Sequence, residues 1–348
     1  MYRVIQWATG SMGRTALRRI IDHPDLELAG VYVYSAGKAG LDAGDIARRE
    51  KTGVRATSDI EEILALDADI VIHTPRITLP YEALNGDVER LLASGKNVIS
   101  SAGFHCPDAH GEEYSASLRA ACEKGGSTLA GLGVNPGGFV ERVVMAATGF
   151  SSRLDHLDVR EMVDASQMTS PEFVFGMMGF GRDPEKDDIR KGPLATLYTR
   201  LFSEVLAQAG SAMQTRIVRV EPSHELTLAP RDIPTGAGPV PAGTVAATRW
   251  RWTAHYENGS SFTLSILWTA DPALHDGETG GHWVVDIAGR PNIRLTLDIH
   301  EGDPDVPSSR ALTDATMAAV LRGIPDVCAA PPGFFAYPAP SAYRTRLG

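Results

Sequence analysis

Cysteine is scarce in this sequence and follows no recognised pattern. Cys106, Cys122 and Cys328 are widely separated, and no C-x-x-C pair occurs. An odd number of scattered cysteines predicts free thiols rather than a disulfide scaffold. The ten histidines also lack the H-x-x-x-H and H-E-x-x-H spacings that metal sites use, so we expect no bound metal.

Long apolar runs and net positive charge are missing as well. No run approaches the ~18 apolar residues that a membrane-crossing helix needs, and the N-terminus has neither a basic region nor a cleavage site. We therefore expect no membrane partner, no signal peptide and a cytoplasmic location. The formal net charge of −10 argues against nucleic acid bound through a basic surface. The 348 residues suffice for two domains.

The N-terminal stretch predicts a strand, a glycine turn and a helix. Residues 2–7 are apolar and β-branched, as in a buried parallel strand, and apolar residues at helical spacing begin at Ala16. This is the context that a dinucleotide fingerprint requires. A pyrophosphate would bind at the N-terminus of the helix, where backbone N–H groups are available. The candidate phosphate-binding residues are Gly10, Ser11, Met12, Gly13 and Arg14.

The turn departs from the G-x-G-x-x-G pattern at its first position, where Ala8 replaces glycine. Alanine tolerates a tight turn only at negative φ, so we expect a negative φ at Ala8. Gly10 would let the backbone approach a pyrophosphate, and Gly13 would let the helix pack closely on the strand. The alternative is a purely structural turn between a strand and a helix in another α/β protein.

The end of the second predicted strand indicates which cofactor binds. NAD-specific proteins usually place a carboxylate there for the ribose 2′-OH, whereas this sequence has Ser35 and Lys38, and Arg14 can point the same way. A hydroxyl and cations favour the 2′-phosphate of NADP(H). The alternative is that Lys38 is only a solvated loop cation, in which case NAD(H) remains possible.

Three further buried strands, at residues 68–74, 97–101 and 127–132, end in polar or glycine-rich loops. Ligands of open α/β sheets bind beyond the carboxyl ends of the strands. We therefore place the ribose and nicotinamide beside these loops, although Thr74 equally fits a capping role and the glycine-rich residues 131–139 equally fit an interdomain hinge. The additional cofactor-binding candidates are Thr74, Pro75, Ser101, Ala102 and Asn135.

Two residues are candidates for the proton donor or the group that orients an amine. His105 lies in the loop at residues 102–111, and an imidazole near pH 7 can donate or accept a proton during carbonyl or imine reduction. Asp164 follows a strand in the second half of the chain. The alternative for His105, as for His110, is that it only hydrogen-bonds the loop or shapes a pocket.

The second half predicts a different architecture. Alternating residues such as Thr248, Trp250 and Trp252 indicate long strands, and short turns between strands favour an antiparallel sheet. A sheet with few helices needs its other face covered, so we expect a homodimer through this sheet. The expected strands are residues 157–162, 215–222, 244–257, 261–269, 282–288 and 293–300, with a helix at 194–209 and a loop at 230–243.

The fold class expected from these patterns is α/β, with an N-terminal Rossmann-type parallel sheet domain and an α+β domain that contains a largely antiparallel sheet. We expect an NAD(P)-binding domain over residues 1–140 and a substrate and dimerisation domain over residues 141–310. The amphipathic helix within residues 311–330 is expected to return to the first domain, because its apolar face needs a sheet to cover.

These motifs, taken in order along the chain, resemble the dihydrodipicolinate reductase-like superfamily, and within it the 2,4-diaminopentanoate dehydrogenase and native amine dehydrogenase branch. The resemblance rests on VIQWATGSMG, the region of residues 35–38, GLGVNPGGFVERV, VDASQMTSPEFVFGMMGFGRDP and TDATMAAVLRGIPDVCAAPPGFF. It implies a Rossmann domain, a second α+β domain, NAD(P)H as hydride donor and reduction of an imine or iminium carbon.

Two departures from the family pattern matter. The first is that the His-His-x-x-Lys type motif for a dicarboxylate substrate is absent. The second concerns the loop after the fourth strand, in which amine dehydrogenases of the branch carry a glutamate. In this sequence that loop contains no acid until Asp108. The leading hypothesis is an NAD(P)H-dependent oxidoreductase acting on a C=N or C=O carbon of a small, fairly apolar molecule, in either direction. The alternative is a non-catalytic NADP(H)-binding sensor or scaffold.

Overall fold

The computed structural model describes residues 1–275, 282–303, 306 and 309–346. The chain divides into two compact units. The first comprises Met1–Gly138 and Thr313–Tyr337, and the second comprises Phe139–Leu312 and Pro338–Gly348. Each unit contains one seven-stranded sheet.

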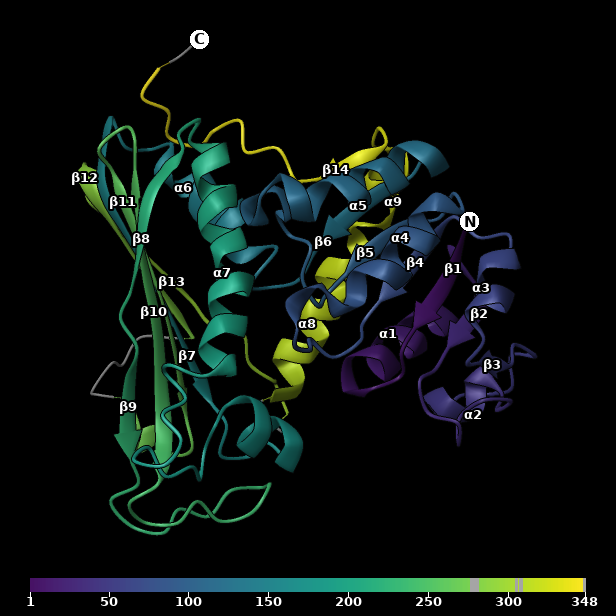
Figure 1. The fold of residues 1–348 in the computed structure, drawn as a ribbon, viewed down its shortest axis with the longest axis horizontal. Helices are drawn as coiled ribbons and strands as arrows, with labels where there is room; N and C mark the ends of the chain where they lie inside the picture. The colour runs from purple at the N-terminus through teal and green to yellow at the C-terminus, as the bar shows by residue number, and fades with distance from the viewer. Residues whose placement is uncertain (276–281, 304–305, 307–308, 347–348) are drawn as a thin grey trace. The chain divides into compact units, whose positions relative to one another are not determined.

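The sheet of the first unit is parallel throughout, and its strands run in the order β14-β6-β5-β4-β1-β2-β3 (Figure 1). This doubly wound order confirms the expected Rossmann-type sheet. The strands are β1 (Tyr2–Trp7), β2 (Leu26–Tyr32), β3 (Ala56–Thr57), β4 (Ile70–His73), β5 (Asn97–Ser100), β6 (Thr128–Gly131) and β14 (Gly333–Phe335).

Helices cover both faces of this sheet. Apolar residues of α1, α8 and α9 join one buried cluster with the side chains of Val4, Ile72 and Ile99, which lie on one face. Right-handed crossovers place α3, α4 and α5 on the other face. The helices are α1 (Ser11–Asp22), α2 (Ala43–Ala47), α3 (Ile60–Ala65), α4 (Asn85–Ala93), α5 (Glu112–Gly125), α8 (Ser309–Arg322) and α9 (Ile324–Ala329).

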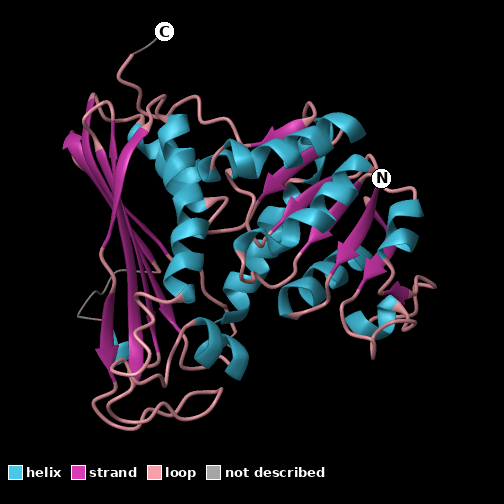
Figure 2. Cartoon of the chain, viewed as in Figure 1, coloured by secondary structure: helices cyan, strands magenta, loops and turns pink. Residues whose placement is uncertain are grey.

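The sheet of the second unit is largely antiparallel, as expected, with long strands that Figure 2 shows in magenta. Its order is β13-β12-β7-β11-β10-β8, and β9 also pairs with β10. Among the pairings of described strands in this second sheet, only that of β7 with β11 is parallel. The strands are β7 (Arg153–Asp164), β8 (Ile217–Pro222), β9 (Glu225–Leu228), β10 (Val245–Tyr256), β11 (Ser261–Thr269), β12 (Trp283–Arg290) and β13 (Ile293–Leu297).

Helix α7 (Pro193–Ala212) packs on one face of the second sheet. The rings of Tyr198 and Phe202 contact those of Trp250 and Trp252, with centroids 5.1 Å apart in each pair. Tyr256 donates a 2.8 Å hydrogen bond to the Leu206 carbonyl. The short helix α6 (Met145–Thr148) and the π-helical segments Phe139–Val144 and Glu172–Met177 complete the helical part of this unit.

Local hydrogen bonds and strand pairing define the ends of several elements in the first unit. Asp59 caps α3, because its carboxylate accepts the Glu61 N–H at 2.8 Å. The glycine- and proline-rich residues 323–334 contain helix α9 and part of β14. Strand β14 forms through pairing with β6, about 200 residues earlier in the chain, which local sequence does not reveal.

Candidate functional site

The carboxyl ends of four parallel strands bring the predicted cofactor-binding loops to one edge of the first sheet. The pairing aligns Trp7 with His73, His73 with Ser100, and Ser100 with Gly131. The segments that follow these strand ends therefore begin side by side. They hold the predicted residues Gly10, Ser11, Met12, Gly13, Arg14, Thr74, Pro75, Ser101, Ala102, His105 and Asn135.

The two glycines of the turn have different surroundings. Gly10 is exposed at the N-cap of α1, and no atom lies within 4 Å of the position that a Cβ would occupy. At Gly13 a Cβ would overlap the Ala8 carbonyl and come within 2.7 Å of Thr74 Oγ1. Gly10 therefore leaves open space at the end of the helix, whereas Gly13 is required for packing.

The expected negative φ at Ala8 is wrong. Ala8 has a φ of +70°, which lies in the left-handed region that favours glycine. The chain thus keeps the backbone conformation of the glycine that stands at the first position of the fingerprint, although the residue carries a Cβ. The Ala8 N–H donates to the Tyr32 carbonyl at 2.9 Å, which ties the turn to the end of β2.

Two cations lie beside the glycine turn. Lys38 Nζ donates to the Thr9 carbonyl at 2.8 Å and to Thr9 Oγ1 at 3.1 Å. Burial, followed by the nearby positive charge of Arg14, lowers the pKa of Lys38. Neither cation forms an ion pair with an acid of the described chain. Ser35 is exposed at the start of the same loop, where its carbonyl accepts the Lys38 N–H at 2.9 Å.

His105 lies deep in the loop that follows β5. Its side chain is only 6% exposed, and a Cβ at Gly137 would stand 2.7 Å from Nδ1. A Cβ at Gly131 would overlap the His105 backbone nitrogen. The two glycines therefore let the loop after β6 close around His105. Asn135, in that same loop, is half-buried.

His73 is a second buried imidazole at this edge. It is fully buried, its Nδ1 lies 3.0 Å from Ser100 Oγ, and burial lowers its pKa to about 3. Ser100 Oγ also accepts the Ala102 N–H at 3.1 Å. His73 is therefore neutral near pH 7 and links the ends of β4 and β5.

Asp164 and Thr74 take part in local hydrogen bonding. The Asp164 carboxylate, at the end of β7 in the second unit, accepts the Ser166 N–H at 2.8 Å. Thr74 Oγ1 donates to the Trp7 carbonyl at 3.1 Å, consistent with a structural role in the turn. Both remain candidates for the roles that we gave them, but part of their hydrogen-bonding capacity is already used.

Sequence reasoning missed an aromatic group and one polar residue at this edge. Trp7 stacks on Tyr32 with centroids 3.7 Å apart and donates to Tyr34 Oη at 2.9 Å. Gln6 is fully buried and hydrogen-bonds the turn. The available signals were the aromatic residues at positions 32 and 34 and the polar residue between Ile5 and Trp7 in an otherwise apolar stretch.

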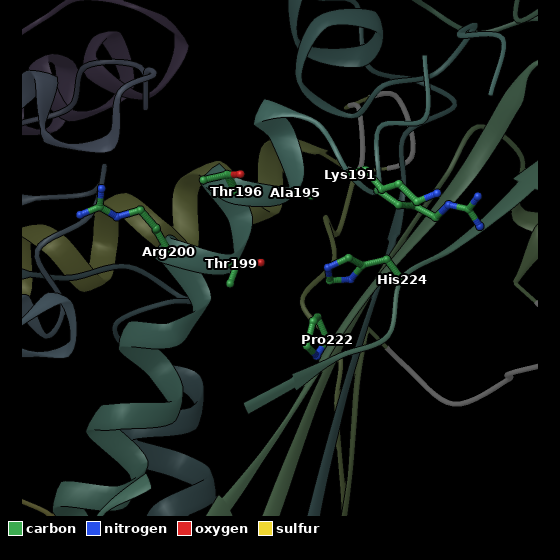
Figure 3. Close-up of a pocket in the computed structure, with 8 residues that line it drawn as sticks. Lys191, Ala195, Thr196, Thr199, Arg200, Pro222 and His224 are labelled. Atoms are coloured by element: carbon green, nitrogen blue, oxygen red, sulfur yellow. The ribbon is translucent and has the colours of Figure 1, made fainter. Parts of the chain in front are cut away.

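The second unit contains an open pocket of about 660 Å³ between α7 and the β8–β9 connection (Figure 3). Arg190 and Lys191 at its rim both pair with Asp188, and Figure 3 shows Arg200 pointing away from His224. The pocket contains none of the predicted site residues. Its lining consists of Arg190, Lys191, Ala195, Thr196, Thr199, Arg200, Pro222 and His224.

Within the described ranges, no group of three or more His, Cys, Asp or Glu side chains is arranged to hold a metal ion. No disulfide joins Cys106, Cys122 and Cys328. No helix in the described part of the chain has the length and apolarity to cross a membrane.

Comparison with known proteins defines the class. Residues 4–124 match the family model described as dihydrodipicolinate reductase, N-terminus. An amine dehydrogenase of Streptomyces virginiae is 27% identical over 310 residues, which cover 86% of this chain and 85% of that enzyme. The protein is an NAD(P)-dependent oxidoreductase.

Two further proteins resemble this chain, one in part of its sequence and the other in fold. A 4-hydroxy-tetrahydrodipicolinate reductase of Neisseria gonorrhoeae is 33% identical over 135 residues, covering 38% of this chain and 46% of the reductase. The solved structure of an amine dehydrogenase from Mycobacterium smegmatis superposes with a TM-score of 0.79 at 21% identity, covering 100% of this chain and 97% of that chain. The resemblance to the dihydrodipicolinate reductase-like superfamily is confirmed.

Proposed function

We propose that this oxidoreductase uses NADP(H) to transfer a hydride to or from the C=N or C=O carbon of a small, fairly apolar substrate. The proposed cofactor preference rests on two cations, Arg14 and Lys38, that lie beside the glycine turn. Neither forms an ion pair with an acidic side chain among the described residues. The relative from Streptomyces virginiae, an amine dehydrogenase, supports C=N chemistry.

The residues of the first unit suit a dinucleotide. The open space at Gly10 and the N–H groups of the first turn of α1 would accept the pyrophosphate. Arg14, Ser35 and Lys38 would bind the 2′-phosphate, and Asn135 would lie near the nicotinamide. The cofactor supplies the hydride, and the chain supplies binding, orientation and a proton.

The experiment that tests the preference compares the wild type with K38M and R14M by titration with NADPH and NADH. We expect each substitution to weaken NADPH binding by about tenfold, since one charged hydrogen bond to the phosphate is lost, and to leave NADH binding nearly unchanged. K124M removes an exposed lysine at the end of α5 and is the control. Equal loss of both cofactors would contradict the 2′-phosphate assignment.

For the chemical step we propose His105 or Asp164 as the proton donor or the amine-orienting group. H105N and D164N should each be assayed on a panel of carbonyl compounds with and without ammonium. A loss of kcat of about 10²-fold or more in one variant, with NADPH binding retained, would identify the group. H23N, at an exposed position after α1, is the matched control. Full kcat in both variants would remove both assignments.

We also propose a homodimer that forms through the second sheet. The face opposite α7 carries Asp158, Arg160 and Asp286, whose side chains are between 23% and 39% exposed. Light scattering at micromolar concentration should give about twice the 37.3 kDa chain mass. A monomer mass would contradict the proposal.

A second candidate function, a non-catalytic NADP(H)-binding sensor or scaffold, is favoured by one feature. The loop from Ala102 to Pro107 contains no acid, whereas the amine dehydrogenase branch carries a glutamate there. This function predicts tight NADPH binding with no turnover on the whole carbonyl and imine panel. Turnover of any member of the panel would eliminate it.

A further inference from the structure

Gln6 is a polar residue in the middle of a buried strand. Its side chain has no solvent exposure. Its Nε2 atom donates to the Ala8 carbonyl at 2.8 Å, to Thr74 Oγ1 at 2.8 Å and to the Trp7 carbonyl at 3.1 Å. One amide thus contacts the strand end, the glycine turn and the segment after β4.

The surroundings determine which end of the amide faces the turn. The Trp7 and Ala8 carbonyls can only accept hydrogen bonds, and the Thr74 hydroxyl uses its proton on the Trp7 carbonyl. The nitrogen of Gln6 must therefore face these three atoms. Its Oε1 is buried and has no hydrogen-bond partner among the described residues. A buried acceptor without a partner is unfavourable, so a compensating role for the nitrogen is expected.

Ala8 needs this support. A residue with a Cβ is disfavoured at a φ of +70°, whereas glycine is not. The Ala8 carbonyl is also the atom against which Gly13 packs, without room for a Cβ. A rotation of the Ala8–Thr9 peptide toward an ordinary conformation would move that carbonyl away from Gln6 and displace the start of α1.

We propose that Gln6 is a positioning residue for the cofactor site: its amide holds the Ala8 carbonyl and so lets alanine occupy a position that otherwise requires glycine. Gln6 acts through the turn, and the proposal needs no contact between Gln6 and a ligand. It rests on the proposed cofactor binding only for its effect on affinity, because the effect on the turn itself is independent of any ligand.

The test is a double-mutant cycle of Q6L, A8G and Q6L/A8G in the full chain, with NADPH titration as the first measurement. Leucine matches the size of glutamine and removes the donor. We expect Q6L to weaken NADPH binding by about tenfold, as the loss of a buried hydrogen bond predicts, and A8G to bind at least as well as the wild type. Because glycine adopts positive φ without support, Q6L/A8G should recover most of the loss.

Hydrogen exchange over residues 8–14 is the second measurement, and it requires no cofactor. Q6L should accelerate exchange there, and A8G should reverse the acceleration. S127A is the control, since Ser127 is a buried residue of the same unit whose hydroxyl donates to the Leu92 carbonyl at 2.8 Å away from the turn. It should reduce thermal stability without changing NADPH affinity or exchange over residues 8–14.

The outcomes separate this inference from the proposed function. If the wild type binds neither NADPH nor NADH, the proposed function fails, and the exchange data alone decide the role of Gln6. If Q6L folds and leaves exchange over residues 8–14 unchanged, the inference is wrong. It is equally wrong if A8G fails to restore Q6L, because the support would then not act through the conformation of Ala8.

Discussion

The two sheets differ in where they place polar side chains. In the first sheet, Gln6, His73 and Ser100 are fully buried near the carboxyl ends of neighbouring strands. In the second sheet, Arg160 pairs with Asp158 and Asp286 on one sheet face, and these side chains are between 23% and 39% exposed. Buried polar groups are costly unless hydrogen-bonded, whereas exposed ion pairs contribute little. The second sheet also buries polar residues such as Thr248 and Ser265, but in the first sheet Gln6, His73 and Ser100 are gathered at the edge that holds the predicted cofactor-binding loops.

The largest expected effect comes from the glycine turn. G13A places a Cβ against the Ala8 carbonyl and Thr74 Oγ1, so we expect a loss of about 1–3 kcal/mol in unfolding free energy and a loss of NADPH binding on the order of 100-fold. Urea unfolding and NADPH titration measure the two quantities.

G10A is the matched control for stability. Gly10 has a φ of −68° and open space at its Cβ position, so the variant should fold with a change below about 1 kcal/mol. The substitution should still weaken NADPH binding, because the new methyl group stands where the pyrophosphate would approach. Equal stability of G13A and G10A would show that the packing of Gly13 is not tight.

The glycine turn of the first unit shows how much the sequence alone could predict. The order of strand, turn and helix from Tyr2 to Asp22 was predictable, because strand composition, glycine spacing and helical periodicity are all local. The conformation of Ala8 was not, because it depends on Gln6 and on Thr74, 68 residues after Gln6. Local sequence patterns therefore predict where the turn lies, whereas its backbone geometry depends on hydrogen bonds between residues distant in the chain.

The second unit shows the same limit. Alternation predicted its long strands, since a period of two is visible within one strand. The strand β9 was not predicted, and the parallel pairing of β7 with β11 was not predictable, because it joins residues as far apart in the chain as His156 and Ser261. Helix α9 lies within residues 311–330, where a helix was expected, whereas strand β14 was missed because it forms only by pairing with β6, about 200 residues earlier.

A smaller effect is expected from the pH dependence of stability. His73 has its pKa lowered to about 3 in the folded protein, whereas an unfolded histidine titrates near 6.5. Below pH 6.5 the unfolded chain binds a proton that the folded chain does not, so stability present at higher pH is lost as the pH falls from 6.5 toward 3. Between pH 8 and pH 5 this one group should cost about 2 kcal/mol.

H73N tests that value, since asparagine does not titrate and can still reach Ser100. Urea unfolding at pH 8 and pH 5 should show a smaller loss for H73N than for the wild type, whatever the stability of the variant at pH 8. H23N should behave like the wild type, because His23 is exposed. The same acid loss in H73N and wild type would assign the pH dependence to other groups.

The smallest expected effect lies in the second sheet. R160A removes a cation that pairs with Asp158 at 3.0 Å and also with Asp286, and partial exposure of all three side chains limits the loss to about 1 kcal/mol. Salt screens such pairs, so the difference in unfolding free energy between wild type and R160A should shrink in about 1 M NaCl. A difference that instead stays constant with salt but increases with protein concentration would mean that Arg160 acts at the proposed dimer interface. In that case the polar face of the second sheet would be buried in the assembly, and the contrast between the two sheets would hold only for the isolated chain.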